Sequence, residues 1–182
     1  MASLEQLTPS ALQTLLQDGN LAGSWTLDPA RSEVQLQTRH TWGLLPLQGA
    51  FTQVAGNGTV TAEGDVSGVL NVAAASVDTK NPRRDKHLRS ADFFDVDNHK
   101  DITFTANGAS PAGDGVRITG TLTVRGVTRP ATLDAKVSSG DGEVQLDGEL
   151  PVNRGDFGLT WNFIGIAAMD STIVVRAVFT RQ

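Results

Sequence analysis

Strict alternation of apolar and polar residues is the feature of this sequence that most restricts its fold. Between Val116 and Val124, every second residue is apolar or glycine, and the residues between them are arginine or threonine. Successive side chains of a β-strand point to opposite faces, so this pattern predicts strands with one buried and one solvated face. Similar rows occur at 33–42, 131–137 and 144–152. Short half-buried strands without helical crossovers predict an antiparallel sandwich or barrel, and the period alone does not choose between them.

Clusters of turn-forming residues separate these rows. The pattern predicts a hairpin turn at residues 55–58 and a Gly-, Pro- and Asp-rich loop at residues 107–115. The last strand is expected from about Ser171 to Thr180. The fold-class prediction depends on this regular spacing of strands and turns.

One short helix is predicted before the strands. Thr8 suits an N-cap, Pro9 suits the first helical position, and Leu12, Leu15 and Leu16 fall on one face. A helix this short is not stable alone, so its leucines must dock on the rest of the protein. We expect it on the outside or at the end of the β-structure. A lid over a pocket and a contact in a homodimer are the alternatives.

Residues 76–104 interrupt the alternation. Loops this long inside a compact domain are uncommon and are usually functional or locally structured. Leu88, Phe93 and Phe94 supply apolar side chains that a solvated loop does not need. Ser90 is a candidate N-cap, so the segment is expected to contain a short helical turn.

Composition excludes several function classes. There is no cysteine, and therefore no disulfide, zinc-thiolate site or cysteine nucleophile. The net charge of −5 argues against a nucleic-acid partner. No apolar run reaches the roughly 18 residues of a membrane-spanning helix, so no transmembrane segment is predicted. The N-terminal residues lack the basic and apolar regions of a signal peptide, which makes a cytoplasmic location the expectation.

Four stretches of the chain, taken in order, resemble one protein family. They are WTLDPARSEVQLQTRH, then SVDT with RDKHL and SADFFDVDNHKDITF, then GTLTVRGVTRPATLDA, and finally VNRGDFGL. Together they are similar to the YceI-like family of lipid (polyisoprenoid)-binding proteins. The resemblance implies a lipocalin-like antiparallel β-barrel of about eight strands over residues 23–182, with a helical or loop insertion around 80–100. Residues 1–22 would be an N-terminal helical extension. Many relatives are exported, and the N-terminus departs from that pattern.

The same resemblance implies an interior pocket for a long apolar chain. Small residues at inward positions agree with it, namely Gly120, Gly148, Ala106, Ala131 and Ala135. An eight-stranded barrel is just wide enough to fill with side chains or to hold one ligand, and small residues favour the ligand. The alternative is that small residues only mark where the barrel tapers.

The expected ligand is a polyisoprenoid, isoprenoid quinone or fatty-acyl lipid, with no other cofactor. Inward positions on the strands and the apolar and basic residues of segment 76–104 form the candidate ligand-binding set. Its members are Val34, Leu36, His40, Trp42, Phe51, Arg84, His87, Leu88, Phe93, Phe94, Phe104, Ile118, Leu122, Leu133 and Trp161.

The cluster of basic residues at 83–89 is the candidate mouth of the pocket. Guanidinium groups bind phosphate or carboxylate bidentately, so Arg84 could select an anionic head group. The alternative is structural: Asp85, Asp92 and Asp95 would pair with the arginines and hold the segment folded. The motif Asn153–Asp156 is likewise expected to form a buried structural network.

No catalytic or metal-binding residue is predicted. The three histidines, His40, His87 and His99, have neither HxH nor HxxxH spacing, and there is no GxSxG motif. A binding protein without chemistry is therefore the main hypothesis. An enzyme that uses His40 inside the same cavity, and an interaction module with a filled barrel, are the alternatives.

Overall fold

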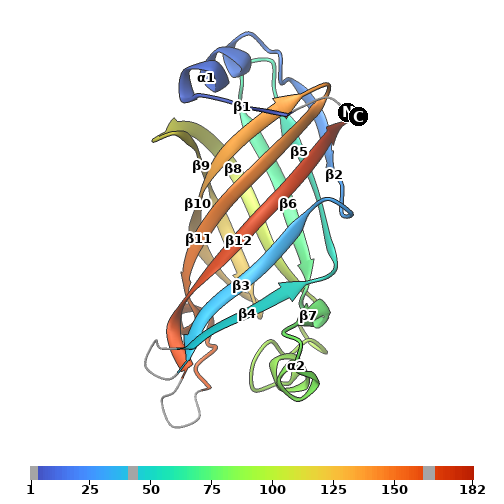
Figure 1. Ribbon diagram of the computed structural model, residues 1–182, viewed down its shortest axis with the longest axis vertical. Coiled ribbons are helices and arrows are strands. Elements are labelled where there is room, and N and C mark those ends of the chain that lie inside the picture. The colour runs from blue at the N-terminus through green and yellow to red at the C-terminus, as the bar shows by residue number, and fades with distance from the viewer. Residues whose placement is uncertain (1–3, 41–44, 162–166) are drawn as a thin grey trace.

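The predicted strands close into one antiparallel barrel in the computed structural model, which describes residues 4–40, 45–161 and 167–182 (Figure 1). Eight strands form the closed ring, each hydrogen-bonded to the next and the last to the first. In order they are β2 (Gly23–Leu27), β5 (Val54–Val60), β6 (Val66–Ala73), β8 (Asp101–Ala112), β9 (Gly115–Val124), β10 (Val127–Gly140), β11 (Glu143–Asn153) and β12 (Ala167–Arg181). The prediction of a barrel of about eight strands is confirmed.

Strand β12 is shared between two neighbours on the same side. Its end, Phe179–Arg181, pairs with β2, while Ser171–Arg176 pairs with β3 (Glu33–His40). β4 (Leu45–Phe51) and β7 (Val77–Asp78) continue the sheet from β3. β3 and β4 therefore form the wall at the lower end of the barrel in Figure 1.

The N-terminal segment adds a strand as well as a helix. β1 (Glu5–Gln6) pairs with Ser138 and Ser139 of β10. α1 (Pro9–Gln17) follows, with the Thr8 hydroxyl accepting from the Ala11 N–H as predicted for an N-cap. α1 lies across one end of the barrel (Figure 1). The domain boundary at residues 22 and 23 stays a prediction.

The segment after β7 forms the second helix, α2 (Pro82–Arg89), at the opposite end of the barrel (Figure 1). Its N-cap is Asn81, whose side-chain oxygen accepts from the Arg84 N–H at 3.1 Å. The prediction of Ser90 as an N-cap is wrong, because Asn81 and the following proline already start the helix. Ser90 instead ends it, and its hydroxyl donates to the His87 carbonyl at 2.6 Å.

The remaining short elements are 3₁₀ turns, η1 (Ala74–Ser76) and η2 (Arg154–Phe157). Within the described ranges, no helix has the length and apolarity needed to cross a bilayer.

The turn predicted at 55–58 is wrong, and the loop predicted at 107–115 is reduced to a turn at Gly113 and Asp114. Residues 55–58 lie inside β5. A Cβ at Gly56 would lie 2.8 Å from the Val69 carbonyl oxygen, so this glycine allows close pairing of strands. β8 also continues through the predicted 107–115 loop to Ala112, after a register shift between Ala106 and Gly108. The last strand begins at Ala167, earlier than predicted.

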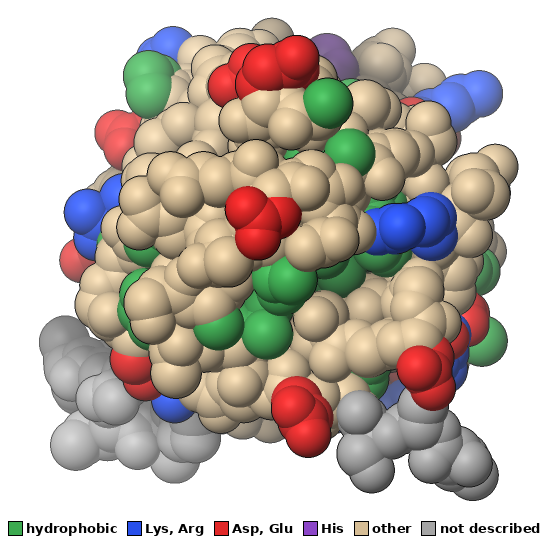
Figure 2. Space-filling model, turned by 90° about the horizontal axis from the view of Figure 1, so that it is seen from above, with side chains coloured by type: hydrophobic (Ala, Val, Ile, Leu, Met, Phe, Trp, Pro, Cys, Tyr) green, Lys and Arg blue, Asp and Glu red, His purple; other side chains and the backbone are tan. Residues whose placement is uncertain are grey.

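The two ends of the barrel differ in what covers them. Leu12 and Leu16 of α1 are buried at one end, and Leu88, Phe93 and Phe94 are buried at the other. Figure 2 looks onto the α1 end and shows apolar side chains reaching the surface between charged ones. The helices thus extend the apolar core beyond the strands.

Candidate functional site

The interior of the barrel is hollow, as two adjoining apolar cavities. The first, here called the α2-side lobe, has a volume of about 200 Å³ and extends to α2. The second, the α1-side lobe, has a volume of about 160 Å³ and extends to α1. Both walls are almost entirely apolar. The arrangement suits a long apolar molecule lying along the barrel axis.

Four side chains line both lobes, and we call them the waist. They come from strands on different sides of the barrel, β6, β8, β10 and β12, and they are Leu70, Phe104, Leu133 and Val175. Because these side chains are common to the two walls, they separate one lobe from the other. A single chain that occupies both lobes must pass them.

Helix α1 closes the α1-side lobe. Leu12 and Leu16 are buried and belong to the lobe wall, together with Trp25. The Trp25 indole N–H donates to the Leu21 carbonyl at 3.0 Å, which leaves its apolar surface facing the lobe. The helix therefore lies at this end of the barrel, one of the two positions expected for it, while the roles of lid and homodimer contact stay predictions.

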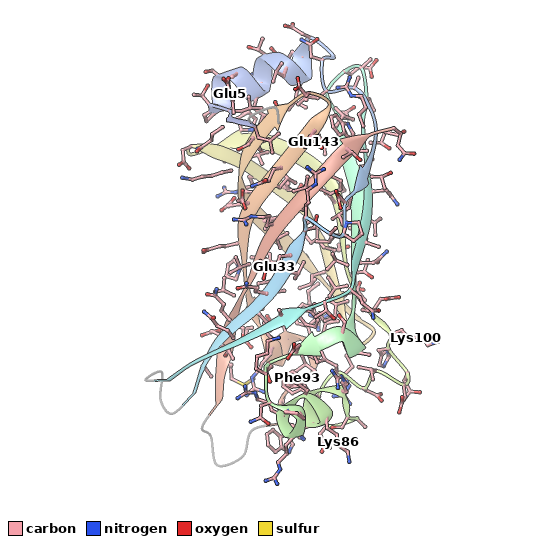
Figure 3. The ribbon with its side chains drawn as sticks, turned by 45° about the vertical axis from the view of Figure 1, so that its right-hand side comes forward. Glu5, Glu33, Lys86, Phe93, Lys100 and Glu143 are labelled. Atoms are coloured by element: carbon pink, nitrogen blue, oxygen red, sulfur yellow. The ribbon has the colours of Figure 1, made fainter. Side chains whose placement is uncertain are left out.

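The segment that follows α2 packs aromatic rings against the end of the barrel. The Phe93 and Phe94 rings meet edge to face with centroids 4.9 Å apart, and Phe94 meets Phe51 at 6.0 Å. In Figure 3, Phe93 lies at the barrel end next to α2, whereas Lys86 projects away from the barrel. All three rings line the α2-side lobe.

Helix α2 is attached to the barrel through Thr79. The buried Asp85 carboxylate accepts from the Thr79 N–H at 2.9 Å and from its hydroxyl at 2.5 Å. Arg84 donates to the same hydroxyl at 2.7 Å and to the Thr79 carbonyl at 2.8 Å. Arg89 donates to the Ala75 and Val77 carbonyls, both at 2.7 Å.

These contacts correct the hypothesis that aspartates pair with the arginines of residues 83–89 to hold the segment folded. The segment is held folded, but through backbone carbonyls and Thr79 rather than through aspartate–arginine pairs. Asp95 lies 3.9 Å from His99 instead, and Asp92 is exposed. Arg83 and Lys86 are also exposed, so Arg84 and His87 are the members of the cluster that line the lobe.

Asp85→Ala is expected to destabilise the protein by about 1–3 kcal/mol, because it leaves the buried N–H and hydroxyl of Thr79 without their acceptor. Asp85→Asn is the matched control, since its amide oxygen can still accept. The free energy of unfolding from urea titration measures both. Equal losses for the two variants would show that the oxygen acceptor is not what matters at this position.

Arg154 is the other cation in the described wall of the α2-side lobe, and unlike the half-buried Arg84 it is buried. It donates to the carbonyls of Ala168, Leu159 and Trp161 at 2.9, 3.0 and 2.8 Å. Burial lowers the pKa of the Arg154 guanidinium from its usual value. The predicted structural network is present here, with the Asn153 side chain accepting from the Gly155 N–H at 2.9 Å. Asp156 is exposed and lies outside it.

Most of the predicted ligand-binding residues lie in the cavity walls. Ile118 lines the α1-side lobe, and Phe104 and Leu133 belong to the waist. The α2-side lobe brings together Val34, Leu36, Phe51, Arg84, His87, Leu88, Phe93, Phe94, Leu122 and Trp161. Trp42 and the side chain of His40 lie outside the described residues. Contact of these residues with a ligand stays a prediction.

Sequence reasoning missed two of the four waist residues, Leu70 and Val175. Both lie in runs where nearly every residue is apolar, 69–77 and 173–179. In such runs the period-two pattern does not say which side chains face inward. Only the strand register does so.

The small inward residues have a different explanation from the predicted one. A Cβ at Gly120 would lie 2.1 Å from the Thr105 carbonyl oxygen, and one at Gly148 would lie 2.8 Å from that of Asp134. The neighbouring strand fills that space, so these two glycines do not enlarge the cavity. Of the five residues, Ala106 lines a lobe.

No convergent group of three or more histidine or acidic side chains that could hold a metal ion is found in the described part of the chain. The side chain of His40, on which the enzyme hypothesis depends, is outside that part.

Comparison with known proteins places the chain in a family. A YceI-like domain model matches residues 25–180. A UPF0312 protein of Pectobacterium atrosepticum is 33% identical over 157 residues, which cover 82% of this chain and 81% of the relative. Protein YceI of Salmonella arizonae is 34% identical over 144 residues, or 75% of each chain.

Solved structures agree on the fold. BcnA of Burkholderia cenocepacia superposes with a TM-score of 0.76 at 24% identity, over 84% of this chain and 98% of that one. A polyisoprenoid binding domain from Saccharophagus degradans has a TM-score of 0.68 at 14% identity. The match covers 87% of this chain and 98% of that domain. From the domain match, the relatives and the shared barrel, we conclude that this chain belongs to the YceI-like family.

Proposed function

We propose that this protein binds and carries one long apolar chain, of the polyisoprenoid, isoprenoid quinone or fatty-acyl type, inside its barrel. The observation that carries the proposal is the pair of adjoining apolar lobes, whose charged lining residues, among those described, lie only at the α2 end. A structural neighbour named as a polyisoprenoid binding domain supports the isoprenoid class. The hollow interior argues against a filled barrel.

The energetics fit such a ligand. Burial of an apolar chain contributes ~0.8 kcal/mol per CH₂, so a chain of about 16 carbons gains ~12 kcal/mol before the costs of association. Those costs, roughly 4–15 kcal/mol, offset much of the gain. Burial of the chain can therefore supply most of the binding free energy. Polar groups of the protein at the α2 end can then select the head group of the ligand.

Native mass spectrometry of freshly purified protein, followed by organic extraction, tests the proposal. We expect a long-chain species of defined mass to accompany the protein, because transfer of such a chain to water is unfavourable. Protein stripped of lipid should bind geranylgeraniol in a fluorescence competition assay. Absence of both a co-purified chain and any binding of geranylgeraniol or palmitate would contradict the proposal.

A further inference from the structure

A residue in the wall of the α2-side lobe carries a buried polar atom that has no hydrogen-bond partner in the described part of the chain. The side chain of His87 lines the lobe, and its Nε2 is buried without a donor or acceptor among the described residues. Buried polar atoms are nearly always hydrogen-bonded, so an exception at a cavity wall indicates a partner that comes from a ligand.

The position of His87 is set by contacts on both sides of it. Arg84, one turn earlier in α2, is bonded to Thr79, and the His87 carbonyl accepts from the Ser90 N–H and hydroxyl. The imidazole packs on the Trp161 ring with centroids 4.1 Å apart. Because α2 is anchored at Thr79 and the imidazole packs on the indole, the His87 side chain occupies a defined place in the wall.

The His87–Trp161 pair also marks where the lobe approaches solvent. Trp161 is 44% exposed, whereas the waist residues Leu133 and Val175 are buried. A ligand whose tail points toward the waist would therefore place its polar end beside His87. This orientation follows from the polarity of the walls, since the α1-side lobe has no charged side chain among its described lining residues.

The charges around Nε2 indicate which head groups it can take. The charged side chains that line the α2-side lobe are Arg84 and Arg154, and no Asp or Glu is among its described lining residues. A cationic amine would meet positive charge and find no carboxylate there. An oxygen that accepts hydrogen bonds would meet N–H donors, since a neutral imidazole can carry its proton on Nε2.

We propose that His87 is the head-group contact of this protein, with Nε2–H donating to a carbonyl, carboxylate or phosphate oxygen at the end of the bound chain. The inference rests on the proposed function and adds to it the residue and the head-group class. It makes His87 a specificity-determining residue, while chain burial supplies most of the affinity.

Ligands that share one geranylgeranyl chain test this inference. The aldehyde, carboxylate and phosphate carry acceptor oxygens, the amine is cationic, and the hydrocarbon has no head group. We expect wild-type protein to bind the three acceptors more tightly than the hydrocarbon, and the amine more weakly than the acceptors. His87→Phe keeps an aromatic ring against Trp161 and removes both nitrogens. It should weaken the acceptors roughly 10-fold, as expected for one lost hydrogen bond, and leave hydrocarbon binding unchanged.

Two further variants control the comparison. His87→Gln retains an N–H donor and should recover much of the acceptor affinity. His99→Phe is the same substitution at a histidine that lines neither lobe, and it should bind every ligand as wild type does. Comparison of the aldehyde with the carboxylate and phosphate separates a carbonyl preference from an anion preference.

The outcomes distinguish this inference from the proposed function. If His87→Phe lowers binding of the hydrocarbon and of the acceptors equally, the head-group inference is wrong, and the carrier function stands. If wild-type protein binds none of the five ligands, the proposed function itself fails. Tighter binding of the amine than of the acceptors would overturn the assigned head-group class.

Discussion

Leu70→Trp is expected to remove most of the dependence of affinity on ligand chain length. Leu70 belongs to the waist, and an indole there would obstruct passage from the α2-side lobe to the α1-side lobe. A chain that no longer reaches the second lobe loses the burial of about four CH₂ groups. At ~0.8 kcal/mol each, this weakens long chains on the order of 100-fold.

The measurement is a series of dissociation constants for geraniol, farnesol, geranylgeraniol and solanesol, which share a head group and differ in length. Wild-type affinity should rise until both lobes are filled, and the rise should stop earlier in Leu70→Trp. Leu70→Met, which keeps the volume, is the control. Phe104→Ala should act in the opposite direction by widening the waist. An unchanged series for Leu70→Trp would mean that one chain does not occupy the two lobes in succession.

Gly120→Ala is expected to destabilise the barrel by about 3 kcal/mol or more. The added Cβ would lie 2.1 Å from the Thr105 carbonyl oxygen and 3.0 Å from the Ala106 Cα. Both contacts are with the backbone of β8, beside the register shift at Ala106 and Gly108, so no side-chain rotation relieves them. The strands themselves must separate.

Gly58→Ala is the matched control, because Gly58 also lies inside a barrel strand and the nearest atom to its Cβ, the Ser67 carbonyl oxygen, is 3.4 Å away. Both variants restrict the unfolded chain to the same extent, so the difference between their free energies of unfolding reports the strand contact. Urea denaturation measures it. Similar stabilities would show that β8 and β9 can move apart at little cost.

Local patterns in the sequence were sufficient for the element types. Alternation at Val116–Val124 predicts a strand with one inward face, and Thr8 and Pro9 predict the start of α1. Both predictions depend on residues close to one another in the chain. The same rows identify Ile118, Leu122 and Leu133 as inward, and all three line the cavity.

Predictions that depend on a neighbouring strand were less successful. The glycines at 55–58 have the composition of a turn, but close approach to β6 places them in a strand. The acidic residues near Arg84 and Arg89 favour ion pairs, yet both arginines bind backbone carbonyls brought to them by the path of the chain before α2. Opposite charges that are close in the sequence do not determine which hydrogen-bond acceptor lies nearest to an arginine in the folded protein.

The sequence by itself determined that this chain forms antiparallel strands with an apolar inner face, capped by a leucine-rich helix and interrupted by one structured segment. Those features follow from side-chain periodicity and helix capping, which act over a few residues. Only the tertiary structure decided that the barrel has two lobes and a waist, and that His87 lines a lobe with its Nε2 buried and without a partner among the described residues. The reason is that strand register and barrel closure bring together side chains such as Leu70 and Val175, which are more than a hundred residues apart in the chain.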